Sequence, residues 1–299
     1  MLILAAVIAT LAGVWLAASL LMSLLFPLYA ERLTTIEPVQ RAWLLRALAL
    51  TPALLAALAW LELFVLPGEI VPHHCHLTNC APHNPELHPA LSTVALLVLV
   101  SFLPVALLTL KTIWSTLALQ RQWRPLSTPR GAYRFLDFAK PVACIVGLLR
   151  PTIYFSRGFI AQLSPAALQV VIAHEQAHAT RYDNLWTLLV RAASISWLNR
   201  RRLVDALELA QEQACDQRAA QRVGDRLVVA ETLLQCQRLA QTPQVACAFL
   251  RGQLAARVQV LLEPDYSTLA PLTLLRFGSL AVLLMAALVI PLHYVIELL

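Results

Sequence analysis

Four long apolar stretches dominate the pattern of hydrophobic and polar positions along the chain, over about residues 2–30, 43–66, 90–114 and 271–296. A bilayer core about 30 Å thick requires roughly 20 apolar residues in a helix, and each stretch reaches that length. The first stretch follows no basic residue and lacks a small-residue cleavage site, so we interpret it as a retained span and not as a signal peptide. The pattern therefore predicts four transmembrane helices.

The basic residues around the first loop predict the orientation of these helices. Arg32 and Arg41 lie in that loop and Arg46 just inside the second stretch, whereas residues 67–89 contain no Lys or Arg. Cytoplasmic loops carry an excess of basic residues. We therefore expect the 67–89 loop and both termini outside a bacterial-type inner membrane, and residues 115–270 in the cytoplasm.

Ionisable residues are rare within the apolar stretches, and Arg46, Glu62, Arg276 and His293 lie within about two turns of an end. We expect these side chains to snorkel towards the headgroups. Since no ionisable group falls near a midplane, the pattern does not favour a transporter.

Composition agrees with an integral membrane protein that has one water-soluble part. Hydrophobic residues make up 59% of the 299 residues and charged residues 13%, with a mean hydropathy of +0.67, which excludes a disordered chain or a coiled coil. Of the 23 Lys and Arg residues, 18 lie between residues 115 and 270. These arginines are scattered without a recognition motif, so the net charge of +6 does not predict direct nucleic-acid binding.

The chain is accordingly divided into three parts. Residues 1–114 form three transmembrane helices with the external loop, residues 115–270 form a cytoplasmic domain, and residues 271–299 form the fourth helix. The polar and apolar positions of the cytoplasmic part alternate as in amphipathic helices.

A metal-site motif lies on one of these helices. Ser164 and Pro165 form a start signal, a hydroxyl N-cap followed by Pro at the first helical position, and the helix continues as AALQVVIAHEQAHATR. His174 and His178 are four residues apart, which places both imidazoles on one face with Glu175 beside them. Two imidazoles can bind zinc, and the carboxylate can hold and deprotonate a water molecule for amide hydrolysis.

Chance is a poor explanation for this HExxH pattern. Random placement of the 8 His and 11 Glu residues gives about 0.008 matches in the whole chain. A surface position for the two histidines is also disfavoured, because the preceding residues 170–173 are all apolar and predict a buried helix. The motif therefore predicts a zinc site.

A catalytic zinc site needs a third protein ligand. No histidine follows the motif within the cytoplasmic part, so the candidates are acidic. A helix predicted from about residue 200 to Gly224, which suits a left-handed C-cap, carries Glu208, Glu212 and Asp216 on one face. Spacing alone leaves open whether these acids include a metal ligand or form a solvated stripe.

At these residues the sequence resembles the BlaR/MecR family of integral-membrane zinc metallopeptidases. The family has HExxH and then a second helix with ExxxD, usually within a Glu-x-Ala-Cys-Asp string, and residues 212–216 read EQACD. The resemblance covers roughly residues 141–262. It implies a gluzincin-like domain.

The resemblance also implies roles for individual residues. His174, His178 and Glu212 bind Zn²⁺ and Glu175 is the general base. Asp216 hydrogen-bonds a ligand histidine and fixes its ring, and Glu208 is a bystander on the solvent side.

One departure from the family concerns sensing. Family members that sense β-lactams carry a large extracellular penicillin-binding domain after the last span, whereas this sequence ends at Leu299. We therefore expect the peptidase core without β-lactam sensing.

Two β-rich segments, 142–147 and 152–156, precede the zinc helix and predict a short hairpin or edge strand. In related zinc peptidases such a strand borders the cleft and pairs with extended substrate. A strand that only covers the helix is an equal alternative. After the zinc helix, Asp183 and Asn184 predict an N-cap for the next helix, and the resemblance adds that Asp183 can brace the site.

The external loop, residues 67–89, holds five of the eight His residues and two of the six Cys residues. On the oxidising side of the membrane, Cys75 and Cys80 predict a disulfide-closed loop. A second interpretation is a metal-binding loop in which His73, His74 and His76 join the two thiols. A third is an epitope for a partner.

These features predict an all-α membrane protein with four transmembrane helices and a cytoplasmic gluzincin-like helical zinc domain that contains a small β hairpin or edge strand. We expect a zinc metalloendopeptidase. The family likeness implies regulated cleavage of a protein substrate, a cytoplasmic winged-helix repressor or the protein itself, in signal transduction. An HtpX-like quality-control protease and a non-catalytic zinc-containing membrane sensor are the alternatives.

Overall fold

The computed structural model describes residues 2–61, 90–240, 246–247, 254–263 and 265–269. Three long apolar helices lie in the first two ranges: α1 (Leu2–Thr34), α2 (Pro38–Trp60) and α3 (Ala90–Trp123). They contain the candidate membrane spans Leu11–Thr34, Pro38–Trp60 and Phe102–Trp123. Three of the four predicted spans thus overlap helices that are long and apolar enough to cross a bilayer.

Two groups of predictions lie outside the described residues. The first is the fourth span, residues 271–296, with Arg276 and His293. The second is Glu62 and the external loop with its candidate disulfide or metal residues: Cys75, Cys80, His73, His74 and His76.

The bounds of α2 and α3 differ from the predicted ones. α2 begins at Pro38, before the predicted residue 43, because proline is preorganised for the first helical position and Arg41 is buried against other helices. α3 continues past the predicted residue 114 to Trp123, because no Gly or Pro interrupts the chain before Pro125. The predicted boundary at residue 115 therefore falls inside a continuous helix.

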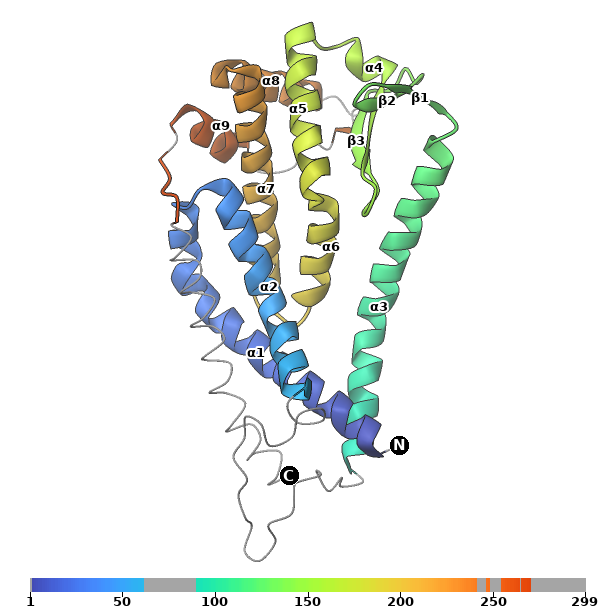
Figure 1. Cartoon of the computed structure of the whole chain (residues 1–299), viewed down its shortest axis with the longest axis vertical. Helices are drawn as coiled ribbons and strands as arrows, with labels where there is room; N and C mark the ends of the chain where they lie inside the picture. The colour runs from blue at the N-terminus through green and yellow to red at the C-terminus, as the bar shows by residue number, and fades with distance from the viewer. Residues whose placement is uncertain (1, 62–89, 241–245, 248–253, 264, 270–299) are drawn as a thin grey trace, which may run out of the picture.

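The membrane helices share a core with the helices that follow the zinc motif. These are α6 (Asp183–Ala193) and α7 (Arg200–Val223), which run beside α2 in Figure 1, with α3 on the other side of α6. Phe26 and Leu45 pack there with Val190, Trp197 and Leu207. The loop between α6 and α7 also hydrogen-bonds to α1, where the Leu198 amide donates to the Ser23 hydroxyl at 3.1 Å.

A five-stranded mixed sheet follows α3. It consists of β1 (Ser127–Arg130), β2 (Tyr133–Leu136), β3 (Val142–Val146), β4 (Thr152–Ser156) and β5 (Ala246–Cys247), in the order β1-β2-β4-β3-β5. The predicted hairpin is confirmed as the antiparallel pair β3–β4. The prediction of an all-α fold with only this β element is wrong in extent, because β2 pairs parallel to β4 and β5 parallel to β3. These are long-range pairings that short-range alternation does not reveal.

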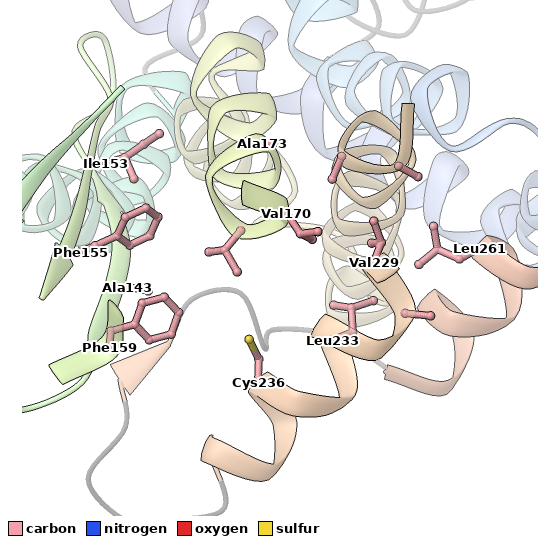
Figure 2. Close-up of a cluster of buried hydrophobic side chains, with 14 residues drawn as sticks. Ala143, Ile153, Phe155, Phe159, Val170, Ala173, Val229, Leu233, Cys236 and Leu261 are labelled. Atoms are coloured by element: carbon pink, nitrogen blue, oxygen red, sulfur yellow. The ribbon is translucent and has the colours of Figure 1, made fainter. Parts of the chain in front are cut away.

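The remaining helices form a second core together with this sheet, and α4 and α5 contact its strands. They are α4 (Arg157–Ile160), α5 (Pro165–Arg181), α8 (Arg226–Ala240) and α9 (Leu254–Leu262). Figure 2 shows Ile153 of β4 and Phe159 of α4 on one side of this core, with Val170 of α5 above and Leu233 of α8 opposite. This packing holds α5, which carries the HExxH motif, between the sheet and α8.

The helix ends follow the predicted signals. The Ser164 hydroxyl accepts a hydrogen bond from the Ala167 amide at 3.1 Å, which confirms the N-cap of α5. α7 ends at Gly224, whose φ of 82° lies in the left-handed region, as the C-cap prediction required.

Candidate metal centre

The metal motif lies at a break between two helices. α5 carries His174, Glu175 and His178 and ends at Arg181; Tyr182 then adopts a left-handed conformation with φ 54°. A non-glycine residue pays a conformational cost there, and such positions cluster at functional sites. The turn brings Asp183, the first residue of α6, back against His178.

The structure brings His174, His178 and Glu212 together, with the third residue contributed by α7. The two Nε2 atoms lie 3.1 Å apart, and they lie 3.5 and 3.4 Å from the Glu212 oxygens. One potential ligand atom from each residue falls within 4.8 Å of the others. Glu208 lies outside this cluster and pairs with Arg191 at 2.5 Å.

A carboxylate faces the other nitrogen of each imidazole. Asp216 Oδ1 lies 2.9 Å from His174 Nδ1, and Asp183 Oδ2 lies 2.7 Å from His178 Nδ1. A carboxylate only accepts, so a neutral ring that donates to it carries its proton on Nδ1 and turns the lone pair of Nε2 towards the cluster.

These residues fit a small divalent ion. With both rings neutral, two imidazole lone pairs and a carboxylate would converge, and a cation at the centre stabilises that arrangement. Two ligands about 2.1 Å from a tetrahedral ion lie roughly 3.4 Å apart, close to the observed separations. Burial lowers the pKa of His178, but the neighbouring Cys215, Glu212 and Asp183 outweigh burial and raise this pKa well above its ordinary value. The surroundings therefore favour positive charge.

Glu175 lies beside this cluster and is almost completely buried. Its Oε1 has no hydrogen-bond partner among the described residues. Burial raises the pKa of Glu175, and the positive charge of the neighbouring histidines only partly offsets that effect. A buried carboxylate with a raised pKa and an unoccupied acceptor suits a general base.

Arg257 of α9 closes the far side of the site. Its guanidinium donates to both oxygens of Asp216 at 2.7 Å and lies 3.0 Å from Glu212 Oε2. Burial alone would raise the pKa of Asp216 and of Glu212, but Arg257 and the histidines hold both below their ordinary values. The two acids are therefore anionic at neutral pH.

Asp183 anchors the side of the site that lies opposite Arg257. It accepts hydrogen bonds from Arg46 of α2 at 2.5 Å and from Arg181 at 3.0 Å. Burial would raise the pKa of Asp183, but the hydrogen bond to His178 and the neighbouring positive charges lower it. His178, Asp183 and Cys215 also form a compact group of potential metal ligands, but these two arginines already neutralise it.

Two predictions near Asp183 are wrong. Asp183 does not cap α6, because Tyr182 occupies the N-cap position and both carboxylate oxygens contact other side chains. Arg46 does not snorkel, because it is only 2% exposed and its charge meets Asp183 inside the protein.

A cleft of about 540 Å³ leads to the centre. Its inner end is lined by Glu175, His178 and Glu212. α3 forms one wall, β3 and the residues after it a second, and α6 a third. The Asn184 amide of α6 donates to the Ile145 carbonyl of β3 at 3.3 Å, which fixes that strand beside the motif.

Sequence reasoning missed the contributions of Arg46 and Arg257. A charged residue inside an apolar stretch is itself a signal for a functional site, so Arg46 could have been found. Arg257 lies in an ordinary amphipathic segment, and only the docking of α9 on α7 brings it to Asp216.

Comparison with known proteins agrees with the geometry. No curated protein and no solved structure matches this chain. A family match, together with the three apolar helices, supports a membrane-associated metallopeptidase of the BlaR1 type. Residues 138–261 match the family model described as BlaR1 peptidase M56, which confirms the resemblance to the BlaR/MecR family that the HExxH and ExxxD motifs predicted.

Proposed function

We propose that this protein is a zinc-dependent metalloendopeptidase of the cytoplasmic membrane that hydrolyses peptide bonds on the cytoplasmic side. The observation that carries the proposal is the convergence of His174, His178 and Glu212 beside the buried Glu175, at the inner end of the cleft. Two nitrogen ligands and one carboxylate are the usual protein ligands of a peptidase zinc site.

The residues of this chain divide the work in the proposed reaction. A zinc ion held by His174, His178 and Glu212 would polarise the scissile carbonyl and acidify a water molecule. Glu175 accepts the proton of that water and returns it to the leaving amine. Asp216 and Asp183 hold the two rings with Nδ1 protonated, so that both Nε2 lone pairs stay directed at the ion.

The cleft supports a polypeptide substrate in an extended conformation. Within the part of the chain that the structure describes, β5 pairs with Val142 and Ala143 of β3, and the rest of β3 lines the cleft wall beyond this pairing. Backbone pairing at a strand edge gives affinity with little sequence demand. On the opposite wall Thr109, Thr112 and Thr116 of α3 present a polar face.

The proposed substrate is a cytoplasmic transcriptional repressor of the winged-helix type, or the protein itself, cleaved in signal transduction. The family match supports this class of substrate by analogy only. A cytoplasmic position of the site agrees with the concentration of arginines between residues 115 and 270, with both termini outside.

Substitution of Glu175 tests the catalytic role. Glu175→Gln removes the base but leaves the three proposed ligands, so we expect stoichiometric zinc and a loss of hydrolysis of about 10²- to 10⁴-fold. Zinc content and cleavage of a peptide library are measured on the purified full-length protein in detergent, with exposed Glu231→Gln as the matched control. Cleavage by Glu175→Gln at the wild-type rate would contradict the assignment.

Removal of the metal tests the role of zinc. If the proposal holds, a chelator abolishes the activity and added Zn²⁺ restores it.

A search for the substrate completes the test. Proteomics of cells that express wild type or Glu175→Gln identifies fragments that depend on the active form. One repressor fragment, or a fragment of the protein itself, supports signalling; many unrelated membrane-protein fragments indicate quality control instead.

A further inference from the structure

Arg46 is a buried charge within a membrane helix. It lies in α2, inside the candidate span Pro38–Trp60, and is 2% exposed. Such a charge is costly unless it is paired. Its Nη2 donates to Asp183 Oδ1 at 2.5 Å, across 137 residues of sequence, and the Asp183 side chain is as deeply buried as its own.

Two indole rings hold the guanidinium in place. Its carbon lies 5.2 Å from the ring centroid of Trp43 in α2 and 5.2 Å from that of Trp186 in α6. The two indoles pack edge to face, with centroids 5.6 Å apart. A planar guanidinium can lie against aromatic rings and donate a directed hydrogen bond at the same time, whereas an ammonium group does this poorly.

Asp183 transmits this constraint to the metal motif. Oδ1 accepts from Arg46 while Oδ2 contacts Nδ1 of His178 at 2.7 Å. Rotation of the carboxylate would break one contact or the other. Arg181 also donates to Asp183, from the end of α5, so Arg46 is the contact through which α2 is linked to the orientation of the His178 ring.

We propose that Arg46 is a positioning residue of the metal centre: it holds Asp183, and through Asp183 the His178 ring, so that the membrane helix α2 tunes metal affinity. This inference rests on the proposed zinc site. Partners of ligand histidines change metal affinity about 10- to 100-fold when they are removed. Arg46 does not contact a histidine itself but holds Asp183, which is such a partner.

Arg41 provides a matched comparison. It is a second buried arginine of α2, and it donates to the Gln213 side chain of α7 and to the Thr34 carbonyl. These contacts join α2 to α7 and α1 of the same helix cluster, and they do not reach a carboxylate that orients a histidine. A general loss of packing at this interface would therefore affect variants of both arginines equally.

The test uses the full-length protein in detergent and has two readouts. Zinc affinity is measured by competition with a chromophoric chelator, and the geometry of the site is followed by the visible absorption of the Co²⁺-substituted protein. We expect Arg46→Met to lower zinc affinity about 10-fold or more and to change the cobalt spectrum. Arg46→Lys restores part of the affinity, because it keeps the charge but not the planar fork. Arg41→Met leaves both readouts unchanged.

A double-mutant cycle tests the route through Asp183. If Arg46 acts through that carboxylate, Arg46→Met together with Asp183→Asn loses no more affinity than Asp183→Asn alone. The double variant also removes the unpaired buried charge that could unfold Arg46→Met. If Arg46→Met yields no monodisperse protein, two other measurements test the inference. They are the zinc affinity of the double variant compared with that of Asp183→Asn, and the zinc affinity of Arg46→Lys.

Each outcome has a distinct meaning. The inference would be overturned if Arg46→Met kept the wild-type zinc affinity and cobalt spectrum. It would also be overturned if the losses of zinc affinity in the double-mutant cycle were additive, or if Arg41→Met lost as much zinc affinity as Arg46→Met. Wild-type protein that holds no stoichiometric zinc would instead refute the proposed function and this inference with it.

Discussion

At the scale of single residues, the centre is a set of acids and bases whose charges are balanced by arginines from distant segments. Asp216 faces Arg257 and Asp183 faces Arg46, and each acid also faces one imidazole of the motif. A buried carboxylate is tolerated only when it is paired and hydrogen-bonded. The two arginines therefore allow anionic groups to hold the histidine rings in a site that excludes most solvent.

Removal of Arg257 tests this balance. Arg257→Met leaves Asp216 buried without its bidentate partner, so we expect a loss of about 3–5 kcal/mol in unfolding free energy. Denaturation of the full-length protein in mixed detergent micelles measures this loss. Arg191→Met breaks the half-exposed pair with Glu208 and serves as the control, with an expected cost of about 0–1 kcal/mol. Similar costs in the two variants would contradict this account of Asp216.

At the scale of elements, the site depends on where α5 begins and where it ends. Ser164 caps its first turn and Tyr182 ends it in a left-handed conformation, so α5 presents His174 and His178 on one face and returns Asp183 to it. Val170 and Ala173, in the middle of α5, belong to the core that includes residues of the sheet and α8 (Figure 2). Local signals at its two ends thus determine the length of α5, and packing determines its orientation in the fold.

Substitution of the N-cap tests the first of these contributions. Ser164→Ala removes the acceptor for the Ala167 amide, so we expect α5 to lose about 1 kcal/mol of stability. Ser164→Asp retains an acceptor and adds a favourable charge at the helix N-terminus, and it should remain within a few tenths of a kcal/mol of wild type. Thermal unfolding in detergent distinguishes them. An Ala variant as stable as the Asp variant would show that the cap contributes nothing.

At the scale of the whole molecule, the membrane helices α1 and α2 share one core with α6 and α7, which follow the HExxH motif. Phe26 and Leu45 pack against Val190, Trp197 and Leu203, and α2 lies beside α6 and α7 (Figure 1). The zinc motif is therefore not carried by an independent soluble unit suspended from the bilayer. A movement of α2 relative to α6 would act directly on Asp183.

A fragment of residues 124–270, which begins after the end of α3, tests this arrangement. Without α1 and α2 it exposes the apolar residues of α6 and α7 and leaves Asp183 without Arg46, so we expect aggregation and no stoichiometric zinc. Co-expression with residues 1–123 should rescue both properties. Size-exclusion chromatography and zinc analysis measure them. A monodisperse fragment with one zinc ion would contradict the shared core.

Much of the fold and part of the site could be predicted from the sequence. The three described apolar helices, the cap at Ser164, the end of α7 at Gly224 and the β3–β4 hairpin depend on interactions within a few residues, which leave a periodic or terminal signal. The additional strands and the pairing of Asp183 with Arg46 were not predicted. That pair joins residues 137 positions apart and β5 pairs with β3 across a similar stretch of chain, so neither leaves a local signal. The β1–β2 hairpin is local and was also missed.

The sequence by itself determined the chemistry that is available: two imidazoles four residues apart on one helix, with a carboxylate beside them, because helical geometry is local. Spacing left open which acid of α7 meets those imidazoles, the family resemblance implied Glu212 with Asp216, and the tertiary structure decided it. The spacing of Glu208, Glu212 and Asp216 is equal, and the packing of α7 against α5 brings Glu212 and Asp216 to the rings and leaves Glu208 with Arg191. The pairing of buried charges between α2, α6, α7 and α9 has the same origin, since a buried charge is stable only where the fold supplies its partner.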